Sequence, residues 1–397
     1  MRVRGRGQVH MPSRQRPTVQ GYSRETYRKA SRRRRSAGPF IAGGIVVVAC
    51  VAVAVCLGIA SQNHSSIETQ PAMQVSEKEA TEPAQTDSSR FVLTLGGSQE
   101  TYVQKGEDYI ESGCHAVDTE EKKDVTSKVT TEGDVDTSKE GDYTVTYTVT
   151  NDGATASKER TVHVVDDMKK NTSGISVMMF HYVYTEDDPP DSTDTNYILD
   201  TKLEKELKWL QEEGYYYPSY QELRAYIDGD HSLPKKSVVL TFDDGQKGFL
   251  KYGIPLLEKY QVPATSFIIC NRSKSATNVI KYASEYVTFQ SHSYSCHEDG
   301  TQNIGRGGRI YDLSKDELVE DQKKAAEVTG TNEAFAYPYG DVSDVAPEAL
   351  EEAGVLCAFT INYGQVHPGD DPMKLDRVRA FGESSLEGFQ AQVKSGA

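Results

Sequence analysis

Residues 237–245 read Ser-Val-Val-Leu-Thr-Phe-Asp-Asp-Gly, an apolar run that leads directly into two neighbouring carboxylates. A short run of β-branched and aromatic residues that ends near a glycine is typical of a buried strand. Asp243 and Asp244 therefore follow a strand end, where barrels of alternating strands and helices carry their catalytic groups. Adjacent side chains point in different directions, so one carboxylate can bind a metal while the other accepts a proton. An Asp-Asp-Gly turn without a function is the alternative.

From Ile175 onward, strand-like and helix-like segments alternate. We expect strands at 175–180, 238–242, 264–270, 286–290, 334–337, 355–361 and 375–381. Helices are predicted where leucines recur at helical spacing (203, 207 and 210), in the segment that ends at 260, and at 314–328 and 345–353. Strands that alternate with helices form parallel sheets with helical crossovers. Seven such strands favour an α/β fold over residues 172–397 that closes into a distorted (β/α)7-type barrel.

A second polar segment, Ser-His-Ser-Tyr-Ser-Cys-His at 291–297, follows the strand that is predicted to end near Gln290. On a helix, two histidines five residues apart point about 140° away from each other and cannot share a metal. In a short loop after a strand, both imidazoles can reach one point. Two histidines and one carboxylate are a recurring ligand set for a catalytic metal. We therefore expect Asp244, His292 and His297 to bind a divalent metal ion, and a structural or surface histidine pair is the alternative.

Two further motifs lie where predicted strands end. Residues 335–341 read Phe-Ala-Tyr-Pro-Tyr-Gly-Asp, and a backbone N–H just after the proline is in a position to bind a developing oxyanion. His181 closes the first predicted strand, in Met-Met-Phe-His-Tyr-Val. Alone, each motif is consistent with an ordinary turn or a core histidine. Four motifs at four strand ends are difficult to explain by packing alone.

The segments Thr-Phe-Asp-Asp-Gly (241–245), Ser-His-Ser (291–293) with His297, and Tyr-Pro-Tyr-Gly (337–340) together resemble the ordered motifs of the polysaccharide deacetylase family, the NodB-homology group of carbohydrate esterases. The likeness spans residues 174–395. It implies a distorted (β/α) barrel, a divalent metal that is usually zinc, and hydrolytic removal of acetyl from N-acetylglucosamine units. By this resemblance the metal ligands are Asp244, His292 and His297. Asp243 would be the general base, and the backbone amide of Tyr339 would help the metal to stabilise the oxyanion.

The sequence departs from the family pattern in three places. Three residues separate Ser293 from His297 where two are common, Ala336 stands where an arginine is common, and no late Leu-x-His motif supplies a general acid. The longer histidine spacing, the Tyr-Pro-Tyr-Gly form and the Phe-His-Tyr around His181 resemble the branch that deacetylates poly-β-1,6-N-acetylglucosamine. By that likeness His181 is the candidate general acid, and His367 is a second candidate.

Residues 89–167 show a different sequence pattern, with short runs of alternating apolar and polar residues between turns that contain glycine. This pattern is typical of a small antiparallel β-sandwich. The stretch Gly-Asp-Tyr-Thr-Val-Thr-Tyr-Thr-Val-Thr-Asn-Asp (141–152) resembles the bacterial immunoglobulin-like modules of surface proteins. We find no chemical motif in it, and expect it to space or anchor the barrel or to bind wall material weakly.

The N-terminal part predicts a membrane anchor. Residues 1–38 hold 12 Lys and Arg and 1 acidic residue, and residues 40–60 form an uncharged apolar run. About 20 apolar residues span a bilayer as a helix, and flanking arginines favour the cytoplasmic side. We therefore expect a basic cytoplasmic tail (1–38), a transmembrane signal-anchor helix (39–60), a flexible linker (61–88) that is poor in large apolar residues, and an extracellular barrel. A cleaved signal peptide, a lipoprotein cleaved at the Val-Val-Ala-Cys of residues 47–50, and a nucleic-acid-binding tail are the alternatives, and we expect no nucleic-acid partner.

The N-terminal segments predict a protein of the cell membrane, and the resemblance implies a metal-dependent N-deacetylase of peptidoglycan or poly-N-acetylglucosamine, with zinc as the expected metal. An O-acetyl esterase of a polysaccharide such as acetylxylan is one alternative. A surface-tethered glycan-binding protein without catalytic activity is the other.

Overall fold

The computed structural model describes residues 85–86, 90–191 and 193–394. The predicted basic tail and transmembrane helix, and most of the predicted linker, lie outside these residues. Within the described part of the chain, no helix combines the length and apolar character needed to cross a bilayer.

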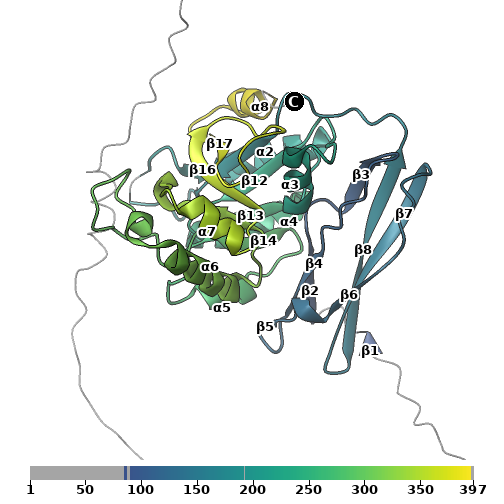
Figure 1. The fold of residues 1–397 in the computed structure, drawn as a ribbon, viewed down its shortest axis with the longest axis horizontal. Helices are drawn as coiled ribbons and strands as arrows, with labels where there is room; N and C mark the ends of the chain where they lie inside the picture. The colour runs from purple at the N-terminus through teal and green to yellow at the C-terminus, as the bar shows by residue number, and fades with distance from the viewer. Residues whose placement is uncertain (1–84, 87–89, 192, 395–397) are drawn as a thin grey trace, which may run out of the picture. The chain divides into compact units, whose positions relative to one another are not determined.

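The first domain consists of two β-sheets (Figure 1). The larger sheet has the order β1–β8–β7–β6, with β3 also paired to β8, and the smaller has the order β2–β4–β5. The strands are β1 (Gln85–Thr86), β2 (Phe91–Leu95), β3 (Glu100–Gln104), β4 (Cys114–Asp118), β5 (Lys123–Asp124), β6 (Val129–Glu132), β7 (Gly141–Asn151) and β8 (Ala154–Val165), and a 3-10 turn, η2 (Thr126–Lys128), precedes β6. Alternate residues of β7, Val145, Tyr147 and Val149, enter a core to which both sheets contribute. The predicted period-two pattern is thus confirmed.

The second domain is a closed barrel of seven parallel strands, in the order β12–β13–β14–β15–β16–β17–β9. The strands are β9 (Ser176–Phe180), β12 (Val238–Phe242), β13 (Ala264–Ile268), β14 (Val287–Ser291), β15 (Ala334–Ala336), β16 (Cys357–Tyr363) and β17 (Leu375–Arg379). Each strand overlaps one of the seven predicted apolar runs. The prediction of a seven-stranded α/β barrel is therefore confirmed.

Helices cover the outside of the barrel (Figure 1). They are α2 (Asp200–Glu212), α3 (Tyr220–Asp228), α4 (Ile254–Tyr260), α5 (Ser275–Lys281), α6 (Lys315–Thr329), α7 (Ala346–Glu352) and α8 (Leu386–Lys394), with short turns η3 (Phe249–Gly253), η4 (Arg309–Asp312) and η5 (Pro338–Gly340). Ser314 begins α6 with a capping box, because its side chain and that of Glu317 each bind the other's backbone N–H. Beside the barrel, β10 (Tyr182–Tyr184) and β11 (Tyr197–Leu199) form a two-stranded parallel ribbon that the sequence did not predict.

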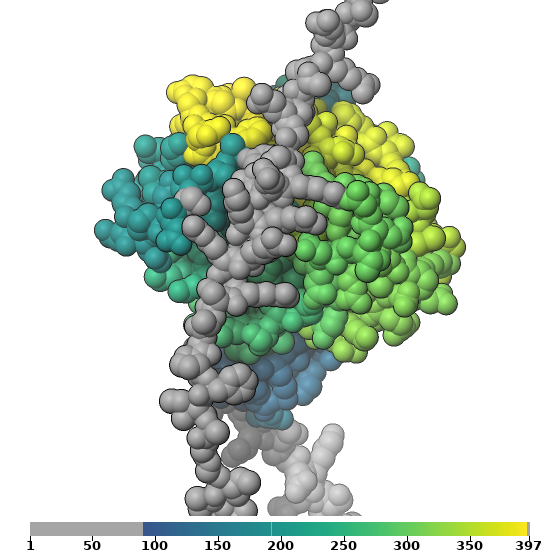
Figure 2. Space-filling model, turned by 90° about the vertical axis from the view of Figure 1, so that its left-hand side faces the viewer, coloured from purple at the N-terminus to yellow at the C-terminus, as the bar shows by residue number. Residues whose placement is uncertain are grey.

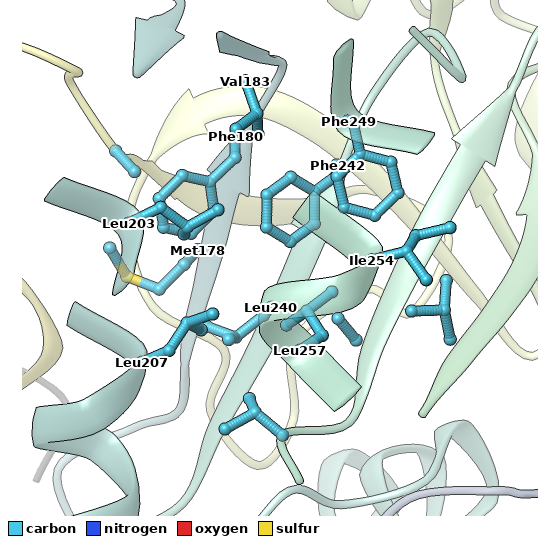
Figure 3. Packing of buried hydrophobic residues seen from close by; sticks show 14 of the residues in the cluster. Met178, Phe180, Val183, Leu203, Leu207, Leu240, Phe242, Phe249, Ile254 and Leu257 are labelled. Carbon is cyan, nitrogen blue, oxygen red and sulfur yellow. The ribbon is translucent and has the colours of Figure 1, made fainter. Parts of the chain in front are cut away.

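The packing between strands and helices fixes the strand ends that carry the polar motifs. In Figure 3 the rings of Phe180, Phe242 and Phe249 lie in a row, with Leu203 of α2 beside Phe180. The ring centroids of Phe180 and Phe242 are 4.9 Å apart, and those of Phe242 and Phe249 are 4.2 Å apart. Phe180 immediately precedes His181 and Phe242 immediately precedes Asp243. Close packing of the two rings therefore positions the backbone of both polar residues.

Candidate metal centre

The predicted site residues follow the C-terminal ends of barrel strands. Asp243 and Asp244 follow β12, His292 follows β14, and His181 follows β9. Parallel strands end at the same side of a barrel, so these residues lie together at one end of it. The expectation that the motifs lie at strand ends is confirmed.

Asp244, His292 and His297 converge. Each offers one ligand atom, and these atoms all lie within 4.8 Å of one another. Oδ1 of Asp244 is 3.4 Å from Nε2 of His292 and 3.2 Å from Nε2 of His297. The three side chains are only 4–8% exposed. Burial opposes ionisation of Asp244, yet the two imidazoles hold the pKa of this carboxyl well below its usual value.

The orientation of His292 suits a metal. Its Nδ1 lies 2.7 Å from the carbonyl oxygen of Ala336, which accepts a hydrogen bond only from a protonated Nδ1. The lone pair of the neutral ring then lies on Nε2, which faces Asp244. Tyr182 donates a hydrogen bond from its hydroxyl to Oδ2 of Asp244, at 2.9 Å. A carboxylate and two imidazoles, with Asp244 and His292 each oriented by an outer partner, are a donor set that fits a divalent metal such as zinc.

The loop that carries the histidines is shaped by Asp321 of α6. The Asp321 carboxylate accepts hydrogen bonds from the backbone N–H groups of Tyr294 and Ser295, both at 2.8 Å, and from the Ser295 hydroxyl at 2.6 Å. Ser293 adopts a left-handed backbone conformation with φ of 66°, which turns the chain sharply. The tight turn brings His297 back beside His292, with ring centroids 5.0 Å apart. Five-residue spacing is thus compatible with a shared site.

Asp243 faces a partner that the sequence analysis missed. Arg377 of β17 donates two hydrogen bonds to the Asp243 carboxylate, each 2.8 Å long, and both side chains are almost completely buried. Burial alone would raise the pKa of Asp243, but the guanidinium of Arg377 lowers it below the ordinary value. Asp243 is therefore ionised at neutral pH and can accept a proton. The only sequence signal was a charged residue inside a predicted barrel strand, and β17 also contains Asp376 and Arg379.

His181 and His367 lie in different places. Burial lowers the pKa of His181 to about 4, although Asp243 and Asp244 oppose this shift. An imidazole with such a pKa is neutral at pH 7 and must receive a proton before it can donate one. Nε2 of His367 lies 3.2 Å from the carbonyl oxygen of Ser173, just before β9 begins. His367 is therefore at the opposite end of the barrel from Asp243, and its prediction as a second acid candidate is wrong.

Tyr339 stands beside the histidines. Its backbone is left-handed, with φ of 62°, and its ring centroid is 4.5 Å from that of His297. The neighbouring Asp341 accepts hydrogen bonds from the N–H groups of Arg306 and Gly308, at 2.8 and 2.9 Å. The guanidinium of Arg306 in turn donates to the carbonyl of Tyr339, at 3.2 Å. These bonds connect the turn at 338–341 to the loop that precedes η4.

Comparison with known proteins identifies both domains. Residues 93–164 match the family described as bacterial surface protein, Ig-like domain. Residues 230–358 match the family described as polysaccharide deacetylase.

Two curated relatives have names that agree with the second of these matches. A poly-β-1,6-N-acetyl-D-glucosamine N-deacetylase of Staphylococcus epidermidis is 26% identical over 213 residues, which are 50% of this chain and 71% of that protein. A protein of the same name from Staphylococcus aureus is 24% identical over 197 residues, 46% of this chain and 67% of that protein. Among solved structures, the Streptococcus pyogenes deacetylase PplD in complex with acetate aligns with a TM-score of 0.47 at 21% identity, covering 55% of this chain and 98% of that chain.

Proposed function

Because the chain is a polysaccharide deacetylase, a carbon–nitrogen hydrolase whose barrel follows a bacterial Ig-like domain, we propose that it removes N-acetyl groups from N-acetylglucosamine units of a cell-wall or extracellular polysaccharide. The observation that carries the proposal is the convergence of Asp244, His292 and His297 next to an ionised Asp243. This arrangement supports a metal site next to a proton acceptor at one end of the barrel. Amide hydrolysis needs both.

We assign the metal to Asp244, His292 and His297, and zinc is the ion that best suits this donor set. Bound there, a divalent metal supplies Lewis acidity, which polarises the acetamide carbonyl and lowers the pKa of water. The outer partners Ala336 and Tyr182 keep the ligands in place.

The other residues move protons and hold charge. Asp243 accepts a proton from the attacking water, and Arg377 keeps the Asp243 carboxylate ionised and oriented. The backbone N–H of Tyr339 is assigned to the oxyanion that forms as water adds to the carbonyl carbon. The proton that Asp243 takes from water passes, by way of His181, to the nitrogen as the C–N bond breaks, since His181 is neutral at pH 7 and must receive a proton before it can donate one. The products are acetate and a glucosamine unit.

The substrate is proposed to be an N-acetylglucosamine polymer. The curated relatives named poly-β-1,6-N-acetyl-D-glucosamine N-deacetylases support a β-1,6-linked polymer, and peptidoglycan is the other substrate to compare. Acetate release from the two polymers and from acetylxylan tests this choice. Faster release from acetylxylan than from either N-acetylated polymer would assign the chain to O-ester hydrolysis instead.

Replacement of a proposed ligand tests the metal assignment. Asp244→Ala is expected to abolish acetate release, whereas Asp344→Ala, which changes an exposed carboxylate, should leave it unchanged. Equal turnover by the Asp244→Ala variant and the unaltered protein would refute the assignment. Absence of acetate release from the unaltered, metal-loaded protein would favour a glycan-binding role without catalysis.

We also propose the arrangement of the chain at the cell surface. Residues 1–38 form a basic cytoplasmic tail, 39–60 a single membrane-spanning anchor, and 61–88 a linker. The Ig-like domain (89–167) and the barrel (172–397) then lie outside the membrane. Protease treatment of intact cells is expected to remove the barrel and to leave a tag at residue 1 protected.

A further inference from the structure

The ribbon of β10 and β11 begins at the metal centre. β10 starts at Tyr182, two residues after β9 ends at Phe180, and Tyr182 pairs with Tyr197 of β11. The Tyr182 hydroxyl donates to Oδ2 of Asp244. The ribbon therefore extends from a proposed metal ligand.

The two faces of the ribbon differ. Val183 and Ile198 point into the core and are 3% and 2% exposed. Side chains alternate along a strand, so Tyr182, Tyr184 and Tyr197 share the other face. All three tyrosines are only half-buried. Core packing explains the apolar face of the ribbon but does not require three aromatic residues on its outer face.

The three rings form a continuous row, which we call the tyrosine face (Tyr182, Tyr184 and Tyr197). The ring centroids of Tyr182 and Tyr197 are 4.5 Å apart, and those of Tyr184 and Tyr197 are 6.5 Å apart. The row thus leads from Asp244 to Tyr184. Figure 2 shows the teal part of the chain, near residue 200, at the surface. The green part, near residue 300, lies on the opposite side of the same face.

The neighbouring chain holds the ribbon in place. The N–H of Tyr182 donates to the carbonyl oxygen of Asn196 at 3.1 Å, and the N–H of Gly382 donates to the carbonyl oxygen of Thr195 at 3.2 Å. A Cβ atom on Gly382 would lie 1.7 Å from the carbonyl oxygen of Tyr197, so only glycine permits this approach. A platform fixed before binding loses less conformational entropy when a ligand binds.

We propose that the tyrosine face is a binding subsite for the pyranose unit next to the one whose acetamide reacts. This inference rests on the proposed function, and it adds the place where the neighbouring sugar unit of the polymer binds. One face of a β-linked pyranose presents C–H groups, which pack against aromatic rings, while tyrosine hydroxyls hydrogen-bond with sugar hydroxyls. The face carries no charged side chain, so an acetylated and a deacetylated neighbour are both compatible with it.

Kinetics of the full-length chain on substrates of different length test the subsite. We expect Tyr184→Ala to reduce kcat/KM for a β-1,6-linked N-acetylglucosamine pentamer about tenfold, mainly through KM, and to leave kcat/KM for the N-acetylglucosamine monomer unchanged. Tyr184→Phe, which keeps the ring, should retain most of the pentamer activity. Tyr102→Ala is the matched control, because Tyr102 is an exposed tyrosine of the Ig-like domain that stacks on His163. Unchanged pentamer kinetics for Tyr184→Ala, or equal losses on both substrates, would overturn the subsite.

A binding measurement distinguishes failure of the subsite proposal from failure of the proposed function. Calorimetric titration of the metal-free protein with the pentamer is expected to show about tenfold weaker binding for Tyr184→Ala than for the unaltered chain. If the unaltered chain binds the pentamer about tenfold more tightly than Tyr184→Ala but releases no acetate, the subsite stands and the deacetylase proposal fails. If acetate is released but Tyr184→Ala binds and reacts normally, the deacetylase proposal stands and the subsite is wrong.

Discussion

Removal of the Arg377 guanidinium tests the electrostatic account of the site most informatively. In the Arg377→Met variant, the Asp243 carboxylate, which is 2% exposed in the unaltered protein, loses both 2.8 Å hydrogen bonds. Breaking a buried ion pair by removing one partner costs about 3–5 kcal/mol, because the other charge stays buried and uncompensated. The carbonyl of Thr360 also loses the hydrogen bond from Nε of Arg377, which adds to the cost.

A double variant identifies the cause of this loss. Asp243→Asn in the Arg377→Met background removes the uncompensated charge, so we expect at least about 2 kcal/mol of the lost stability to return. Urea unfolding of the metal-free protein measures this, with the fluorescence of Trp209, the single tryptophan of the chain, as the probe. Trp209 belongs to the core of the barrel and reports on that domain.

Additive effects of the two substitutions would contradict an interaction between Arg377 and Asp243. If the effects of Asp243→Asn and Arg377→Met on the free energy of unfolding add to within about 0.5 kcal/mol, the two side chains do not interact energetically. Arg377 would then have no role in holding Asp243 ionised.

Three further variants test other parts of the account. Burial raises the pKa of Glu206 to about 8, so the free energy of unfolding should fall as pH rises from 4.5 to 8. Glu206→Gln should remove that part of the fall, which is ~5 kcal/mol at most. Equal pH dependence of urea unfolding in the variant and the unaltered chain would contradict this. Asp321→Ala should weaken metal binding about 10–100-fold in calorimetry, relative to Asp316→Ala on the same helix, because it releases the histidine loop. Gly340→Ala should lower Tm more than Gly369→Ala, since a Cβ at 340 would lie 2.3 Å from Cγ1 of Ile361, whereas a Cβ at 369 would have no neighbour within 4 Å. Equal Tm values for the two variants would show that the turn at 340 moves to accommodate the Cβ without loss of stability.

The barrel could be predicted because its signals are local. Each strand is a short apolar run, and the polar residues Asp244 and His292 come directly after two of them. Parallel strands end on one side of a barrel, so topology alone brought these residues together. The same reasoning located His181 correctly at the end of β9.

The partners of these residues could not be predicted, because they depend on distant contacts. Arg377 pairs with a carboxylate 134 positions earlier, and an arginine in a strand does not reveal which neighbour it faces. Asp321 looked like one of many carboxylates on a polar helix, and its role appears only when α6 packs beside the histidine loop. The β10–β11 ribbon was missed because strands of three residues are too short for periodicity to indicate them.

The metal content of the purified protein shows whether Asp244, His292 and His297 bind a metal ion. After loading with zinc and gel filtration, elemental analysis should find one zinc ion per unaltered chain and per His163→Ala control, and less than a tenth of that in variants with alanine at Asp244, His292 or His297. Full zinc content in any of the three variants, or none in the unaltered chain, would contradict the assignment of these side chains as a metal centre.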